Sequence, residues 1–187
     1  MDRTYGLDRG KVFPAEHARS LLNPARRLVQ SPRRTVAAIG LEQTDHVLEV
    51  GSGPGFFSPS IAAAVPQGMS VTFDLQPEML AIARERVGAR GRFVQGDGRI
   101  LPFANASFDC IFVATVLGEL PDRTALVTDA HRILRSGGTL AIAETRRDSD
   151  FIAIAELREL VEPNGFRFAG RRGMRWQYVA KFERLST

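Results

Sequence analysis

A carboxylate followed by three closely spaced glycines forms the sharpest motif of the chain: Glu49, Gly51, Gly53 and Gly55. Glycines let the backbone turn tightly and approach a ligand, because they carry no Cβ that would stand in the way. A dinucleotide-binding fingerprint would place its third glycine at position 56, where this sequence has Phe56. An acidic residue just before the turn suits a cationic ligand and would repel a pyrophosphate. The motif therefore indicates a loop that contacts a cationic ligand, with a plain strand-to-helix turn as the alternative.

Two aspartates follow at the ends of the next two expected strands. Asp74 ends the strand after the glycine motif, where a carboxylate can accept hydrogen bonds from both hydroxyls of a ribose. The alternative for Asp74 is a favourable charge near the start of the helix that begins at Pro77. Asp97 lies between Gly96 and Gly98, which places a second carboxylate beside the same cleft unless the segment is a plain Asp-Gly turn.

Alternating strand and helix patterns must position these residues. Short apolar runs predict strands over residues 46–50, 71–74, 92–95, 108–113 and 139–144. Periodic apolar positions predict helices over residues 56–65, 77–87, 122–135 and 150–161, the third of which Gly137 and Gly138 should stop. This order predicts a doubly wound α/β fold with mostly parallel strands, right-handed crossovers and a ligand at the carboxyl ends of the strands.

The last two expected strands, over residues 166–169 and 176–182, have no helix between them. Residues 170–175 should therefore form a hairpin turn, which makes one strand of the sheet antiparallel. A period of two residues places Trp176, Tyr178, Ala180 and Phe182 on one face of the last strand. We expect this face to belong to the core of the sheet.

The segment before the first strand, residues 1–45, is expected to be helical over residues 15–22, 24–30 and 32–39. Pro24 and Pro32 separate these helices. The core does not need the segment to complete its sheet, yet the segment is too apolar for a free tail. We therefore expect a single domain over residues 1–187, in which residues 46–187 form the ligand-binding core and residues 1–45 form a lid or cap.

Length and composition exclude several classes of protein. The chain has 187 residues, which is typical of one domain, and a net charge of +4. Its one cysteine, Cys110, excludes an internal disulfide and a cysteine-based metal site, and its three histidines lack the spacing of metal ligands, so no metal is expected. The first thirty residues are charged throughout, and no apolar stretch approaches the ~18 residues of a membrane span. These features predict a cytoplasmic protein without a transmembrane segment.

The chain resembles the class I S-adenosylmethionine-dependent methyltransferases in four stretches: VLEVGSGPGFFS, VTFDLQPEMLAIARERV, FVQGDGRILPFANASFDCIFVATVLGEL and HRILRSGGTLAIAE. Within that class it is similar to the group of small-molecule methyltransferases and ubiquinone/menaquinone C-methyltransferases. The resemblance covers residues 44–145 closely and the end of the chain more loosely. It implies a Rossmann-like, mostly parallel seven-stranded sheet of order 3-2-1-4-5-7-6, in which strand 7 is antiparallel. It also implies an enzyme whose cofactor is S-adenosyl-L-methionine.

The resemblance further implies which residues contact the cofactor. They are Glu49, Gly51, Ser52, Gly53 and Gly55 at the methionine end, Asp74 and Leu75 at the ribose and adenine, Asp97 and Gly98 at the adenine, and Ala114 at the end of the fourth strand.

The methyl acceptor is not identified by the sequence. Residues 114–121 lack the Asn/Asp-Pro-Pro-aromatic motif of amino methyltransferases that act on adenine or glutamine, so a small molecule is favoured. The candidate catalytic residues are His17 and Glu119. We expect residues 5–30 to fold over the carboxyl ends of the strands, with Phe13 and His17 nearest the methyl group and Glu119 on the opposite wall. The alternatives are a surface histidine and a carboxylate at a helix start.

Several alternatives stay open. Tyr5, Arg146 and Arg147 are further candidates for the acceptor pocket, and the arginines at positions 19, 26, 27, 33 and 34 keep an anionic lipid or nucleic acid open as the acceptor. The chain could also bind S-adenosylmethionine or S-adenosylhomocysteine without catalysis. A more remote alternative is an NAD(P)-dependent oxidoreductase, which the missing glycine at position 56 disfavours. No oligomeric state is predicted.

Overall fold

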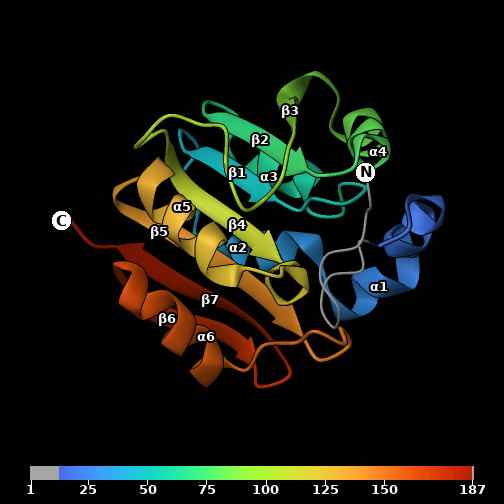
Figure 1. Cartoon of the computed structure of the whole chain (residues 1–187). Helices are drawn as coiled ribbons and strands as arrows, with labels where there is room; N and C mark the ends of the chain where they lie inside the picture. The colour runs from blue at the N-terminus through green and yellow to red at the C-terminus, as the bar shows by residue number, and fades with distance from the viewer. Residues whose placement is uncertain (1–12, 187) are drawn as a thin grey trace.

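The centre of the structure, a computed structural model that describes residues 13–186 without the side chains of residues 28 and 29, is a seven-stranded sheet (Figure 1). Its strands are β1 (His46–Val50), β2 (Met69–Asp74), β3 (Gly91–Gln95), β4 (Phe108–Ala114), β5 (Leu134–Thr145), β6 (Phe166–Met174) and β7 (Gln177–Arg184). The strand order is β3-β2-β1-β4-β5-β7-β6, and β7 is antiparallel to both neighbours while the other pairs are parallel. The predicted α/β fold, its strand order and its antiparallel strand 7 are therefore confirmed.

Helices cover both faces of the sheet. The α-helices are α1 (Pro24–Val29), α2 (Pro32–Ile39), α3 (Ser58–Ala64), α4 (Pro77–Val87), α5 (Arg123–Ile133) and α6 (Ile154–Val161). Short 3-10 helices are η1 (Ala15–Leu22), η2 (Gly88–Arg90), η3 (Leu117–Glu119) and η4 (Glu162–Asn164). One buried apolar cluster lies between the sheet and α2 and α3, and another lies between the sheet and α5 and α6. The core thus has the two layers of helices that a doubly wound sheet requires.

The alternation of side chains along β1 decides which way its polar residue faces. Val47 belongs to the cluster beneath α2 and α3, whereas Leu48 and Val50 belong to the cluster beneath α5 and α6. Glu49 lies two residues from Val47 and therefore faces α3. The carboxyl ends of the parallel strands point to the right in Figure 1, toward α1.

Two predicted helix boundaries were wrong. Helix α5 does not extend to the paired glycines Gly137 and Gly138, because Leu134 is already extended and pairs with Phe108 of β4. The glycines therefore lie inside β5. Helix α6 begins at Ile154, four residues after the predicted start, since residues 146–153 form a loop.

The predicted hairpin is longer than its sequence pattern indicated. Strands β6 and β7 stay paired up to Met174 and Gln177, which leaves the turn at residues 175 and 176. Trp176 consequently lies outside the strand and is 45% exposed, so its predicted place in the core was wrong. Tyr178, on the same expected face, is buried as predicted.

Among residues 13–186, no helix has both the length and the apolar character needed to cross a membrane. Within the same residues, no group of three or more metal-ligating side chains comes together. Cys110 is a free thiol and is buried, as expected for a structural cysteine.

Candidate functional site

The three glycines after β1 form a tightly folded loop at the carboxyl edge of the sheet. Gly51, Gly53 and Gly55 have φ values of +66°, +53° and +76°, a region that side chains with a Cβ rarely adopt. The backbone N–H groups of Gly51 and Ser52 donate hydrogen bonds of 2.8 and 3.1 Å to the carbonyl oxygen of Phe73 at the end of β2. The loop is therefore held against β2 by its own backbone.

Only some of these glycines are required by close packing. A Cβ at Gly51 would lie 2.4 Å from Cγ2 of Val116, and a Cβ at Gly55 would lie 3.0 Å from the backbone of Ala83 in α4. A Cβ at Gly53 would have Leu21 Cδ1 as its nearest neighbour, at 3.8 Å. Gly53 is thus the glycine of the loop that faces the most open space.

Asp74 connects this loop to the start of α4. Its Oδ2 accepts a hydrogen bond of 2.7 Å from the Gly53 N–H, and its Oδ1 accepts one of 2.9 Å from the Gln76 N–H. The side chain is buried, and burial raises the pKa of Asp74 although these backbone hydrogen bonds lower it. Each carboxylate oxygen can accept more than one hydrogen bond, so both keep capacity for hydroxyl groups of a ligand.

Glu49 lies beneath the glycine loop with its side chain buried. Its Oε2 accepts a hydrogen bond of 2.5 Å from Oγ of Ser58, a fully buried residue at the first position of α3. Burial raises the pKa of Glu49 to about 8, the Ser58 hydrogen bond lowers it, and the charge of Asp74 raises it. A ligand ammonium group beside this carboxylate would favour its charged form.

The Asp97 turn follows β3 and is partly exposed to solvent. The Gly96 N–H donates a hydrogen bond of 3.0 Å to the Asp74 carbonyl oxygen, which holds this turn beside the end of β2. Asp97 pairs with Arg99 at 2.6 Å, and hydrogen bonds from Arg99 lower the pKa of Asp97. Gly98 packs near Val50, since a Cβ at Gly98 would lie 3.6 Å from Cγ1 of Val50.

Leu75 follows Asp74 at the same edge of the sheet, and its carbonyl oxygen accepts a hydrogen bond of 3.2 Å from Nε2 of Gln95. On the other side of β1, Ala114 is buried at the end of β4. The chain then turns through Thr115, which has a φ of +53°, and reaches Val116 against the glycine loop. The structure therefore brings the predicted cofactor residues to one edge of the sheet, at the ends of β1, β2, β3 and β4.

Glu119 ends η3, beyond the tip of β4, and is half-buried. Burial, together with the charges of Asp148, Asp150 and Asp74, raises the pKa of Glu119 to about 8. The loop that carries Asp148 and Asp150 packs closely on η3, because a Cβ at Gly118 would lie 2.1 Å from the Asp150 carbonyl oxygen. Several carboxylates therefore gather where β4 and β5 end.

The described part of the N-terminal segment lies against the same edge. Nε2 of Gln76 donates a hydrogen bond of 2.9 Å to the Phe13 carbonyl oxygen, and Leu21 is the nearest neighbour of the open face of Gly53. In α1, the guanidinium of Arg26 lies 4.3 Å from the centre of the Phe56 ring. The segment thus contacts the loops after β1 and β2.

The two candidate catalytic residues lie on different elements, His17 in η1 and Glu119 in η3. The side chain of His17 is exposed, while its backbone carbonyl accepts a hydrogen bond of 2.7 Å from Oγ of Ser20. Tyr5 lies outside the described residues. Ser58 and Val116 were not predicted as site residues. The position of Ser58 in the first turn of a helix that follows a buried strand was the available signal.

Comparisons with known proteins agree with this geometry. Residues 48–142 match the family model described as a methyltransferase domain. The chain is 35% identical over 116 residues to a demethylmenaquinone methyltransferase of Deinococcus radiodurans, covering 60% of this chain and 48% of the relative. It is 32% identical over 118 residues to a ubiquinone/menaquinone biosynthesis C-methyltransferase UbiE of Pseudomonas putida, covering 60% of this chain and 46% of the relative. The chain thus spans about half the length of these curated relatives.

A solved structure of a SAM-dependent methyltransferase from Aquifex aeolicus has the same fold. It superposes with a TM-score of 0.84 at 21% identity and covers 92% of this chain and 99% of its own.

Proposed function

Since this chain belongs to the methyltransferase domain family, whose model matches residues 48–142, we propose that it transfers a methyl group from S-adenosylmethionine to a small-molecule acceptor. The predictions of a class I methyltransferase and of S-adenosylmethionine as its cofactor are confirmed by the family match, and the sheet order agrees with them. The alternative of an NAD(P)-dependent oxidoreductase is set aside for the same reason. The acceptor and the roles of individual residues belong to the proposal.

The edge of the sheet that carries the predicted cofactor residues has the chemistry that S-adenosylmethionine needs. When bound, S-adenosylmethionine supplies an electrophilic methyl group on a positively charged sulfur. In our proposal, Glu49 holds the ammonium group and Asp74 accepts hydrogen bonds from the ribose hydroxyls. Leu75, Asp97 and Gly98 surround the adenine. The open face of Gly53 and the spare acceptor capacity of Asp74 support this assignment.

The protein's own contribution is to orient the two reactants and to exclude water from them. We assign residues 13–30 to the wall of the acceptor cavity, supported by the contacts of Phe13 with Gln76 and of Leu21 with Gly53. Residues 1–45 would then act as the lid of a single-domain enzyme. A cytoplasmic location belongs to the same proposal.

Glu119 is the favoured proton acceptor. A carboxyl group with a pKa of about 8 is partly ionised near neutral pH, so it can take a proton from the methyl acceptor. Glu119 also lies beyond the tip of β4, beside the predicted cofactor residues. His17 is the second candidate and has less support, because its side chain is exposed. A role for Glu119 fits an acceptor that loses a proton as it is methylated.

A hydroxylated ring of the quinol type is the acceptor class that we favour. The relatives named as demethylmenaquinone and ubiquinone/menaquinone methyltransferases support this choice, although they share only part of their length with this chain. An anionic lipid or nucleic acid is the weaker candidate for the methyl acceptor, because only the arginines between residues 19 and 34 support it.

The observation that carries the proposal is the carboxylate of Asp74 beside the open face of Gly53. The test has two parts. S-adenosylmethionine and S-adenosylhomocysteine should each raise the melting temperature, because a ligand that binds the native state stabilises it, and NAD should not. Transfer of a radiolabelled methyl group to a panel of small quinols then separates an enzyme from a protein that only binds the cofactor. Stabilisation by NAD without stabilisation by either adenosyl ligand would overturn the proposal.

A further inference from the structure

A pocket of about 470 Å³ lies between the loop after β5, the start of α6 and the β6–β7 hairpin. Three arginines, Arg146, Arg171 and Arg175, line it together with the apolar side chains of Phe151, Ile154 and Trp176. This volume is within the ~300–1,000 Å³ of small-molecule sites. No residue predicted to bind the cofactor lines the pocket, and its lining comes from the β5–β7–β6 side of the sheet.

Among residues 13–186, none of the three arginines of the pocket forms an ion pair with a carboxylate. The ion pairs formed there use other arginines, such as Arg123, Arg135 and Arg158. No carboxylate lines the pocket. Three positive charges that converge on one hollow repel one another, and an anion bound between them would relieve that repulsion. Guanidinium groups also match phosphate and carboxylate oxygens in geometry.

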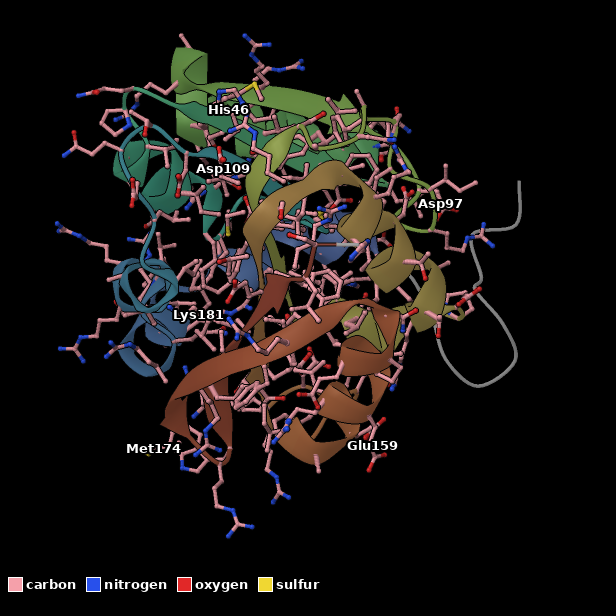
Figure 2. All side chains as sticks on the ribbon, turned by 90° about the vertical axis from the view of Figure 1, so that its left-hand side faces the viewer. His46, Asp97, Asp109, Glu159, Met174 and Lys181 are labelled. Carbon is pink, nitrogen blue, oxygen red and sulfur yellow. The ribbon has the colours of Figure 1, made fainter. Side chains whose placement is uncertain are left out.

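The hairpin turn that carries Trp176 is held against the loop after β5, while its apolar side chains are exposed. The Arg146 N–H donates a hydrogen bond of 2.8 Å to the Trp176 carbonyl oxygen, which ties the hairpin turn to the loop after β5. The guanidinium of Arg146 lies 5.5 Å from the centre of the Phe151 ring. Trp176 is 45% exposed, and Met174 beside it is 62% exposed. Figure 2 shows Met174 at the outer end of the hairpin, where side chains with nitrogen tips project from the ribbon.

We propose that this pocket is a second ligand site, which binds an organic phosphate or carboxylate whose anionic group is carried on an apolar body. The arginines bind the anionic group, and the ring of Trp176 with Phe151 and Ile154 covers the apolar part. The pocket shares no residue with the predicted cofactor site, and Arg146 is the residue of its lining that the sequence also offered for the acceptor pocket. We assign Arg146 to this second site, which goes beyond the proposed methyl transfer. Its occupant would also contact the loop of residues 146–153, which carries Asp148 toward Glu119.

The single tryptophan of the chain makes binding directly observable. Trp176 lines the pocket, so its fluorescence reports on this site without a contribution from any other tryptophan. We would titrate the protein, without S-adenosylmethionine, with octyl phosphate and with octanoate below their micelle-forming concentrations. At least one of them should give a saturable change, and the comparison decides between phosphate and carboxylate. Octanol and inorganic phosphate, which each lack one half of the ligand, should bind at least tenfold more weakly.

A double variant tests the arginines. Arg171→Gln with Arg175→Gln removes both positive charges while keeping polar side chains, and it should weaken the binding of octyl phosphate or octanoate by at least tenfold, with an unchanged melting temperature. Arg172→Gln is the matched control, because Arg172 lies on the same strand but does not line the pocket. Its affinity should be that of the unmodified protein.

Three results would overturn the proposal. They are equal binding of octanol, full affinity in the double variant, and a fluorescence change that appears with phosphatidylglycerol vesicles but with neither monomeric anion. The last result would make the hairpin a membrane-contacting surface instead. None of these measurements depends on methyl transfer, so failure here leaves the proposed function untouched.

Discussion

The carboxylate of Asp74 accepts a hydrogen bond of 2.7 Å from the backbone N–H of Gly53, so the end of β2 holds the glycine loop that follows β1. The other oxygen of the same carboxylate binds the N–H of Gln76 at the start of α4. Two readings of Asp74 from sequence, a ligand contact and a charge at a helix start, are therefore compatible. The residue that would hold the ribose also shapes the loop beneath it.

Asp74→Asn should consequently affect both binding and stability. The amide can accept a hydrogen bond through one atom only, and a hydrogen bond to a charged group contributes about 1.5–3 kcal/mol. We expect the affinity for S-adenosylhomocysteine to fall by about tenfold or more, and the melting temperature to fall by roughly 3–12 °C. Calorimetric titration and thermal melting measure the two effects. Glu85→Gln, on the exposed side of α4, removes a nearby carboxylate as the control. An unchanged dissociation constant in Asp74→Asn would leave Asp74 a structural role alone.

The glycines of the loop should differ in what they tolerate. Gly51→Ala should destabilise the fold, because the new Cβ would lie 2.4 Å from Cγ2 of Val116, and Val116→Ala should restore part of the loss. Gly53→Val has space for its Cβ but strains a φ of +53°, so it should abolish S-adenosylhomocysteine binding with a modest loss of stability. Urea unfolding and calorimetric titration of these variants distinguish the cases. Normal binding by Gly53→Val would mean that the cofactor does not pass over the loop.

Much of this edge of the sheet follows from the sequence, since its signals are local. The glycine spacing predicts a turn that brings the backbone close to a ligand, and period-two and helical patterns predict the strands and helices around it. Asp74 could be placed at the edge because it ends an apolar run. The strand order came from the resemblance to methyltransferases and not from the patterns alone.

Features that depend on tertiary contacts were missed or misplaced. The expected helix began at residue 56 and therefore did not mark Ser58 as the first residue of α3. The hydrogen bond from Ser58 to Glu49 depends on which side of β1 faces α3, and a sequence pattern does not give that. Trp176 fits the alternation of β7, but alternation does not say where a strand ends. Gly137 and Gly138 resemble a helix stop, yet pairing of Leu134 with Phe108 had already ended α5.

Glu144 should make the stability of the protein depend on pH. Its side chain is buried near the end of β5, where neither carboxylate oxygen makes a hydrogen bond of good geometry among residues 13–186. Burial raises the pKa of Glu144 from 4.5 to about 8, although the backbone of Ile152 lowers this pKa in part. Between these pH values the unfolded chain has lost the proton while the folded chain keeps it. The free energy of unfolding should therefore fall as pH rises from 4.5 toward 8.

Glu144→Gln removes this titration, so the variant should gain stability relative to the unmodified protein as the pH rises. We expect a relative gain on the order of 2 kcal/mol between pH 5 and pH 8, measured by urea unfolding at both values. Glu159→Gln is the control, because Glu159 is exposed on α6 and points away from the core in Figure 2. If the difference in free energy of unfolding between the variant and the unmodified protein is the same at both pH values, the prediction is contradicted.

Glu119→Gln tests the proposed proton acceptor. Methyl transfer should fall by roughly 10²–10⁴-fold while S-adenosylhomocysteine still binds, because the change removes a base but no cofactor contact. The rate of the unmodified enzyme should rise with pH through about 8, as Glu119 loses its proton, and the variant should lack this rise. His17→Ala, which changes an exposed side chain, should retain most of the activity. The opposite pattern in the two variants would assign the catalytic role to His17.

Removal of residues 1–30 should separate cofactor binding from methyl transfer. The seven strands and the helices α2 to α6 all lie beyond this segment, so the truncated chain should fold and bind S-adenosylhomocysteine. It would lose the contact of Phe13 with Gln76 and the cover that Leu21 gives to Gly53, and water could then reach the methyl group. We therefore expect binding within a few-fold of the full chain and no detectable transfer. Leu21→Ala in the full chain removes part of the same cover without deleting a segment, and it should reduce transfer with a smaller effect on binding. Full activity in the truncated protein would show that the acceptor cavity is built without this segment.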